Sequence, residues 1–287
     1  MGNFKEIGDS KLVSSKYSGR AIVYLESYED YQIFFERWFY DEGEHLEFRS
    51  SDSGSGGGCT KVIKDVETDR NNDIVSFGIV DRDALLQQRK WSEFWETDDL
   101  KFMQMKPFGD NIRPLCRWEI ENYLLDIDEI EMLLADIGKG SPRKIREKSV
   151  VINDLLNHCQ ALIPIMACNI LKHSKGQEAV PMKFCIEDTG RKPIENKIKQ
   201  KIDESDKSQY DDILLKIESF QFGSDDLTED NFNAINRIID GKRLFERLKR
   251  HNQLIEDYRF LLARRIKERD KIDTELTEMI DIFKRAI

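Results

Sequence analysis

Two short, largely apolar segments, each followed directly by an acidic residue, constrain the fold of this chain more than any other feature. Residues Ala21–Leu25 read Ala-Ile-Val-Tyr-Leu, and residues Ile74–Val80 read Ile-Val-Ser-Phe-Gly-Ile-Val. Apolar runs without polar alternation are typical of strands that are buried on both faces of a parallel sheet. Because neighbouring parallel strands need a crossover connection, usually a helix, the sequence predicts an α/β fold with a parallel sheet flanked by helices.

The segments around these strands complete the expected α/β unit. Five aromatic residues at helical spacing predict a helix over Tyr28–Tyr40 that packs on the sheet, so we expect them in the core rather than on a base-stacking surface. A second strand is predicted at His45–Arg49, a helix at about Thr60–Thr68 and a fourth strand at Phe102–Lys106. The aromatic residues are Tyr31, Phe34, Phe35, Trp38 and Phe39.

Strand signals almost vanish in the second half of the chain. Arg117–Leu125 leads into a helix that ends near Ile137, and Gly138–Pro142 has the composition of a linker. Thr228, followed by two acidic residues, indicates a helix start. We therefore predict an α/β domain over residues 1–137 and a mainly α-helical domain over residues 138–287, for partner binding, dimerisation or substrate binding. The helical patterns cover Val150–Leu171, Pro193–Ile202, Tyr210–Phe220, Glu229–Ile239 and Arg243–Ile287.

The charge of the chain is unevenly distributed. The 45 basic and 55 acidic side chains give a formal net charge of −10, and an acidic excess argues against a nucleic-acid partner. Residues 1–130, however, hold 16 basic and 27 acidic side chains, whereas the remainder holds 29 and 28. The helical half is therefore close to neutral, and the total charge does not exclude nucleic acid.

The sequence also indicates the cellular compartment in which the protein is expected. No stretch approaches the ~20 apolar residues that cross a bilayer, and the N-terminus lacks the apolar run of a secretory signal. The five cysteines include no Cys-x-x-Cys pair, so neither a disulfide framework nor a zinc site is indicated. We expect a cytoplasmic protein with reduced cysteines at Cys59, Cys116, Cys159, Cys168 and Cys185.

Acidic residues follow two of the predicted strands. Glu26 closes the first strand, and Asp81 and Asp83 close the third; Asp30 lies one helical turn beyond Glu26. A single acid at the end of a strand is commonly a solvated loop carboxylate or a helix cap. Several acids at the same edge of a parallel sheet, where ligands of such sheets bind, instead indicate a site for a bound ion. Carboxylates are ligands for Mg²⁺, and a two-ion site would suit phosphoryl transfer.

These residues resemble the TOPRIM domain of topoisomerases, bacterial primases and overcoming-lysogenization-defect nucleases. That family has a glutamate after its first strand and an Asp-x-Asp after its third, as in Ile22–Asp30 and Phe77–Asp83 here; its usual glycine after the glutamate is Ser27. Arg117–Leu125 resembles the Glu-Asn-x-Leu-Leu block of one nuclease subgroup, in which a later Gly-Lys also opens a helix, as at Gly241-Lys242. The motifs and length most resemble the TOPRIM effector subunits of the PARIS anti-phage defence system.

The resemblance implies a TOPRIM-like catalytic domain over residues 1–137. Within it the acids Glu26, Asp81 and Asp83 would hold Mg²⁺ or Mn²⁺, with Asp30 as a further metal ligand. Glu121 would be a further acid at the catalytic site, a role for which Glu119 competes, and Lys242 would stabilise developing negative charge. Such effectors are toxic nucleases, active as dimers, that are held in check by an ABC-type ATPase partner, respond to a phage trigger and are thought to cleave tRNA.

A basic stretch in the helical half is a candidate nucleic-acid surface. Residues Lys242–Lys271 contain 11 basic and five acidic side chains. Such a run is usually a solvated helix face with i,i+4 ion pairs, but beside a nuclease site it also suits an RNA backbone or an acidic partner, and both interpretations stay open. The candidates for nucleic-acid binding are Arg143, Lys144, Arg247, Lys249, Arg250, Arg264 and Arg265.

Two other functions compete with the nuclease. An apolar strand that ends in Asp-x-Asp also opens haloacid-dehalogenase-like phosphatases, although their motif normally lies on the first strand and is followed by Thr or Val, whereas Ala84 follows here. The chain could instead be a non-catalytic interaction module, whose acids bind an ion while its helical half docks on a partner.

Overall fold

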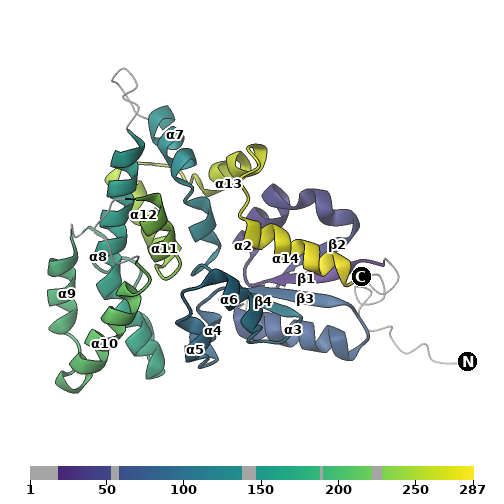
Figure 1. Ribbon diagram of the computed structural model, residues 1–287, viewed down its shortest axis with the longest axis horizontal. Helices are drawn as coiled ribbons and strands as arrows, with labels where there is room; N and C mark the ends of the chain where they lie inside the picture. Colours follow the sequence, from purple (N-terminus) through teal and green to yellow (C-terminus); the bar gives the residue numbers. More distant parts are fainter. Residues whose placement is uncertain (1–18, 53–57, 138–146, 188–189, 222–227) are drawn as a thin grey trace, which may run out of the picture. The chain divides into compact units, whose positions relative to one another are not determined.

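A four-stranded, all-parallel sheet forms the centre of the first half of the chain (Figure 1). The computed structural model describes residues 19–52, 58–137, 147–187, 190–221 and 228–287. Its strands lie in the order β2-β1-β3-β4, and all five residues of both β1 and β3 are buried. The prediction of an α/β fold with a parallel sheet is confirmed. The strands are β1 (Ala21–Leu25), β2 (Leu46–Ser50), β3 (Ser76–Val80) and β4 (Ile112–Pro114).

The chain divides into two compact units. The first, here called the sheet unit, consists of Met1–Val80, Phe108–Pro114 and Ile272–Ile287; the second, the helical unit, consists of Asp81–Pro107 and Leu115–Lys271. This division differs from the boundary at residue 137 that the sequence suggests. Residues 81–107 and 115–137 belong to the helical unit, and the last helix, α14 (Thr274–Arg285), belongs to the sheet unit. The expected linker at Gly138–Pro142 lies outside the described residues.

Two helices cover opposite faces of the sheet. Successive residues of a strand point to opposite faces. A Cβ atom added at Gly78 would lie 2.6 Å from Val62 of α3 (Cys59–Asn71), so only glycine lets α3 approach this closely. The neighbouring Phe77 stacks on Phe283 of α14, with ring centroids 4.3 Å apart. The sheet is therefore buried between α3 and α14.

The aromatic segment after β1 is helical but not one regular α-helix. It runs as α2 (Tyr28–Ile33), a π-helix (Phe34–Trp38) and a 3-10 helix (Tyr40–Glu44). Phe34, Trp38 and Phe39 are buried, and the Phe34 and Phe39 rings lie 4.9 Å apart. The predicted core role is confirmed for these three residues, whereas Tyr31 and Phe35 are only half-buried.

The helical unit is built around α8 (Lys148–Ser174), which packs against α7, α9, α10, α11 and α12. This helix has the length and mean hydropathy of a membrane span, but 72% of its most apolar window is buried inside the protein, as expected of a core helix. The other helices here are α4 (Ala84–Gln87), α5 (Trp91–Phe94), α6 (Asp99–Met105), α7 (Ile127–Ile137), α9 (Arg191–Lys199), α10 (Lys207–Glu218), α11 (Glu229–Asn236), α12 (Gly241–His251) and α13 (Arg259–Glu268), with 3-10 helices at Ile120–Leu124 and Glu204–Asp206.

One sequence prediction about secondary structure is wrong. The expected strand at Phe102–Lys106 lies within and directly after helix α6, whose N-cap Asp98 accepts a hydrogen bond from Lys101 N, and the fourth strand is β4. The helical pattern at Arg243–Ile287 is confirmed and is divided among three helices, α12, α13 and α14. The helix start at Thr228 is confirmed, because its hydroxyl accepts from Asn231 N at 3.2 Å.

Candidate active site

The predicted acids lie where β1 and β3 end. These strands pair in parallel with Tyr24 opposite Gly78, and continuing that register places Glu26 beside Val80. Asp81 is bonded to Val80, and Asp83 follows two residues later. Glu26, Asp81 and Asp83 are half-buried, and one carboxylate oxygen of each lies within 4.8 Å of the others, a group that could hold a metal ion.

The spacing of these oxygens suits a small, hard cation. Two ligands on opposite sides of Mg²⁺, each at ~2.1 Å from the ion, are about 4.2 Å apart. This separation is comparable with the 4.8 Å within which the three carboxylate oxygens lie. Three carboxylates supply the oxygen donors that Mg²⁺ and Mn²⁺ prefer over thiolate or imidazole donors. The donor set therefore fits the predicted ion.

Arg82, which the sequence did not single out, anchors the turn between the two aspartates. Its guanidinium is fully buried and donates to the carbonyl oxygens of Phe94, Cys116 and Glu96. It lies 4.4 Å from the ring centroid of Phe102, and burial lowers its pKa to about 10, so it stays charged at neutral pH. Because these partners come from separate segments of the helical unit, Arg82 fixes the backbone that carries Asp81 and Asp83.

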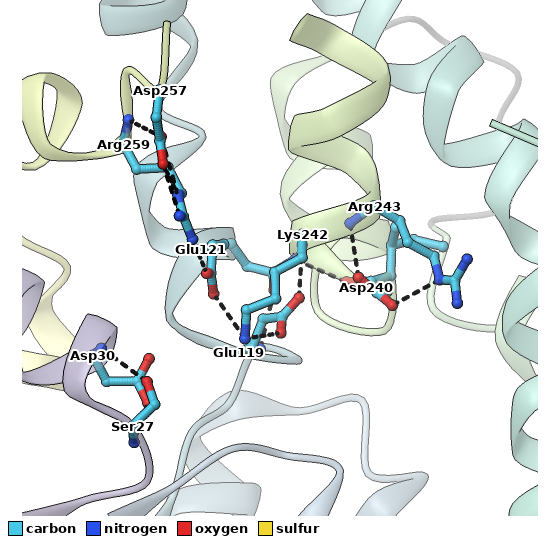
Figure 2. A network of polar contacts seen from close by, with 11 residues as sticks. Ser27, Asp30, Glu119, Glu121, Asp240, Lys242, Arg243, Asp257 and Arg259 are labelled. Carbon is cyan, nitrogen blue, oxygen red and sulfur yellow. Dashed lines mark hydrogen bonds and ion pairs between the residues drawn. The ribbon is translucent and has the colours of Figure 1, made fainter. Parts of the chain in front are cut away.

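Asp30 has a structural role at the start of α2 (Figure 2). Its Oδ2 atom accepts a hydrogen bond from Ser27 N at 3.0 Å, and Ser27 Oγ accepts from Asp30 N at 3.0 Å. This pair is a capping box. Among the described residues, the carboxylate group that could hold a metal does not include Asp30, so the structure assigns it to helix capping rather than to the predicted ligand set.

The capping box predicts the effect of changing Ser27. Ser27→Ala removes the cap and is expected to lower the free energy of unfolding by about 1 kcal/mol, whereas Ser27→Gly, the usual residue of the TOPRIM pattern, should cost only a few tenths. Urea unfolding followed by circular dichroism measures both. An alanine variant as stable as the glycine variant would contradict the capping role.

A second polar network gathers the predicted residues Glu121 and Lys242 with Glu119 (Figure 2). Lys242 Nζ lies 3.0 Å from Glu119 Oε2 and 3.7 Å from Glu121 Oε2. Glu119 Oε1 also accepts from Lys242 N at 2.7 Å. Glu121 is fully buried and is further paired with Arg259, whose Nη1 lies 2.9 Å from Glu121 Oε1. Lys242 thus contacts both Glu119 and Glu121, the two candidates for the further acid at the catalytic site. Arg259 also belongs to this network, although the sequence did not assign it to the site.

Asn122 and Gly241 hold this network together. The Nδ2 atom of Asn122 donates to Asn236 O at 2.8 Å and to Ile239 O at 2.9 Å, while its Oδ1 accepts from Glu119 N at 3.0 Å. A Cβ atom added at Gly241 would lie 2.6 Å from Asn122 Oδ1 and 2.9 Å from Asn122 N. The Glu121-Asn122 segment and the helix start at Gly241-Lys242, more than a hundred residues apart in the sequence, therefore pack directly against each other.

The electrostatics of the network connect it to Asp83. Burial, and then the negative charge of Glu119, raise the pKa of Asp83, while Lys242 opposes this effect. The same two causes raise the pKa of Asp240, the N-cap of α12, which accepts from Arg243 N at 2.8 Å. A bound cation would offset the repulsion between carboxylates that are crowded in this way. Carboxyl groups with such raised pKa values are often found at functional sites.

A basic pocket of about 370 Å³ lies at this network, in the helical unit. Its lining includes Lys242 and Arg259 of the network. Five cations and two carboxylates face it, so its charge suits a phosphate group. The charged lining residues are Lys183, Lys242, Lys249, Arg250, Arg259, Glu246 and Asp257.

The other predicted nucleic-acid contacts have mixed outcomes. Arg247 is 4% exposed and donates to Cys185 O and Ile186 O, so it is a buried structural residue and this prediction is wrong. Arg264 forms an i,i+4 pair with Glu268 at 2.7 Å, in line with a solvated, ion-paired face. Arg265 is half-buried and pairs with Asp136 of α7 at 2.8 Å. Lys249 and Arg250 line the basic pocket; Arg143 and Lys144 lie outside the described residues.

Comparison with known proteins adds no relative. A scan against models of protein families found no match to this chain, and a search of curated protein sequences found none either. The likeness of the strand-end acids and the Glu121-Asn122 segment to the TOPRIM family therefore stays a prediction.

Proposed function

We propose that this protein is a Mg²⁺- or Mn²⁺-dependent TOPRIM nuclease that cleaves RNA. The observation that carries the proposal is the group of three carboxylates, Glu26, Asp81 and Asp83, at the ends of adjacent parallel strands. A bound divalent ion would supply Lewis-acid stabilisation of the charge that develops on the phosphate. Glu26, Asp81 and Asp83 would hold it, and Arg82 would keep the two aspartates in place.

The network of the helical unit supports phosphodiester chemistry rather than simple ion storage. Lys242, held by Glu119 and Glu121, would place a positive charge where a leaving oxygen becomes negative. The basic pocket that shares Lys242 would hold a neighbouring phosphate of the substrate strand. An RNA strand offers a run of such phosphates, whereas a phosphomonoester offers one.

The resemblance to anti-phage effectors extends the proposal to a biological role. In this view the protein acts on tRNA as a homodimeric toxin that halts translation, and an ABC-type ATPase partner restrains it until a phage trigger is sensed. The exposed ion pairs on α13, such as Arg264–Glu268, leave both charges at the surface, available to a partner.

Purified protein incubated with tRNA, plasmid DNA and a generic phosphomonoester, with and without Mg²⁺ or Mn²⁺, tests the function. We expect metal-dependent cleavage of tRNA that Glu26→Gln abolishes. The matched control is Glu67→Gln, which changes an exposed glutamate on α3 of the same unit and should leave the rate unchanged.

The other outcomes of this experiment separate the competing functions. Phosphate release from the monoester would support a phosphatase. No turnover on any substrate, with the ATPase partner and trigger also supplied, would support a non-catalytic interaction module and overturn the nuclease.

A further inference from the structure

A second, larger pocket in the helical unit has the chemistry of a nucleotide site. Its volume is about 740 Å³, within the range of small-molecule sites. It combines two tryptophans with several basic and amide side chains. The lining residues used below are Arg89, Trp91, Trp95, His173, Gln209 and Lys216.

Two cations in this pocket are available to a ligand. Arg89 and Lys216 are exposed, and within the described parts of the chain neither forms an ion pair with a carboxylate. Lys175 also lines the pocket but is paired with Asp206, and Asp212 is the one acidic lining residue. An unpaired guanidinium and an unpaired ammonium are suitable partners for phosphate oxygens.

The tryptophans give the pocket aromatic surface. Trp91 and Trp95 are half-buried, with Lys216 Nζ 5.5 Å from the ring centroid of Trp95. Aromatic side chains beside cations are the elements with which proteins bind unpaired nucleotides, because every base has a face that can stack. Burial lowers the pKa of His173, so at neutral pH its imidazole is uncharged and can both donate and accept a hydrogen bond at a base edge, as can the amide of Gln209.

Helix α4 connects this pocket to the candidate active site. It begins at Ala84, directly after Asp83, and its last residues, Leu86 and Gln87, line the pocket together with Arg89. At 1.5 Å per helical residue, Asp83 and Gln87 are separated by about 6 Å of rise, and Arg89 follows the end of the helix with a positive φ of 56°. Asp83 and the pocket residues Leu86 and Gln87 therefore lie at opposite ends of one short helix, within reach of neighbouring nucleotides of one strand.

We infer that this pocket binds an unpaired nucleotide, with its base against Trp91 and Trp95 and its phosphate on Arg89 and Lys216. The inference deepens the proposed function, on which it rests for the substrate: the nucleotide would belong to a loop or single-stranded part of the RNA. A free nucleotide offers the same chemistry, and the test below separates the two sources.

Binding of a fluorescent single-stranded RNA of about eight nucleotides, a length typical of such sites, tests the inference in EDTA, where metal-dependent cleavage is absent. The double variant Arg89→Gln/Lys216→Gln changes exposed side chains and should weaken binding at least tenfold without a cost in folding. Trp91→Ala should weaken it about tenfold. The matched control is Lys192→Gln, an exposed lysine on α9 outside the pocket, which should bind like the unchanged protein.

Competition distinguishes the ligands. Displacement by unlabelled single strands but not by an RNA duplex supports an unpaired nucleotide of RNA, and displacement by mononucleotides at equal nucleotide concentration supports a free nucleotide in the same pocket. Equal binding by the double variant and the unchanged protein, or preference for duplex, would overturn the inference. If the double variant and the unchanged protein cleaved RNA at the same rate, this would also count against the nucleotide pocket but would leave the proposed nuclease function intact. If RNA binding depended on the pocket but no cleavage occurred, the pocket would be supported and the nuclease function refuted.

Discussion

Asp83→Asn is expected to lower the rate of metal-dependent RNA cleavage at least ~100-fold, a loss typical of removing one charge-stabilising group from an active site. Asparagine keeps the size of the side chain but removes the negative charge that would hold the cation. Asp81→Asn should have a similar effect, because its carboxylate belongs to the same group of three. Cleavage rates and relief of growth inhibition in cells that express the free protein measure both variants.

The same substitution should not destabilise the protein. Burial and Glu119 raise the pKa of Asp83 in the folded state from the ordinary carboxyl value of 3.8 to about 6. Between these two pH values the folded protein binds more protons than the unfolded chain, so its stability falls as the pH rises through this range. At neutral pH the uncharged amide of the Asp83→Asn variant avoids this cost. We therefore expect a free energy of unfolding equal to or above that of the unchanged protein, as often found when a functional charge is removed.

A surface aspartate provides the control. Asp211→Asn changes an exposed residue of α10 that pairs with Lys199 at 3.0 Å, and such pairs contribute ~1 kcal/mol or less. It should alter neither cleavage nor stability appreciably. Full toxicity in both Asp81→Asn and Asp83→Asn would remove these residues from the metal site, and a large loss of stability in Asp83→Asn would show that the acid is structural.

The strands and their acids could be predicted because their signals are local. The run Ala21–Leu25 is apolar at every position and is the strand that the structure shows, and an acid that directly follows a strand is fixed by chain continuity. The fourth strand could not be found, since Ile112–Pro114 spans three residues and ends in proline. The apolar residues near Phe102 instead serve a short helix, whose signal was its capping residue Asp98.

The residues that support the site could not be predicted because they depend on contacts between distant segments. Nothing near Arg247 in the sequence indicates that it is buried against carbonyl oxygens some 60 residues earlier. Arg82 has its partners 12 to 34 residues later in the chain. The charged run around Arg247 therefore predicts a surface position, whereas its guanidinium is buried and donates to the main-chain oxygens of Cys185 and Ile186.

Gly241→Ala is expected to lower the free energy of unfolding by about 3 kcal/mol, at the upper end of overpacking effects. The new methyl group would lie 2.6 Å from Asn122 Oδ1 and 2.9 Å from the main-chain nitrogen of Asn122. Neither atom can move without breaking bonds that Asn122 makes to Glu119, Asn236 and Ile239. Urea unfolding measures the loss of stability, and hydrogen exchange of the Asn122 amide locates it.

Gly43→Ala is the matched control for this prediction. A Cβ atom at Gly43 would meet only the Phe35 ring, at 3.6 Å, which is ordinary van der Waals contact, so its effect should stay within about 0.5 kcal/mol. Because Lys242 N donates to Glu119 directly beside the crowded contact, Gly241→Ala should also reduce RNA cleavage, whereas Gly43→Ala should not. If the two variants were equally stable, the Gly-Lys helix start would not require glycine for packing against Asn122, and the join between the two motifs would have to be explained by the Asn122 and Glu119 hydrogen bonds alone.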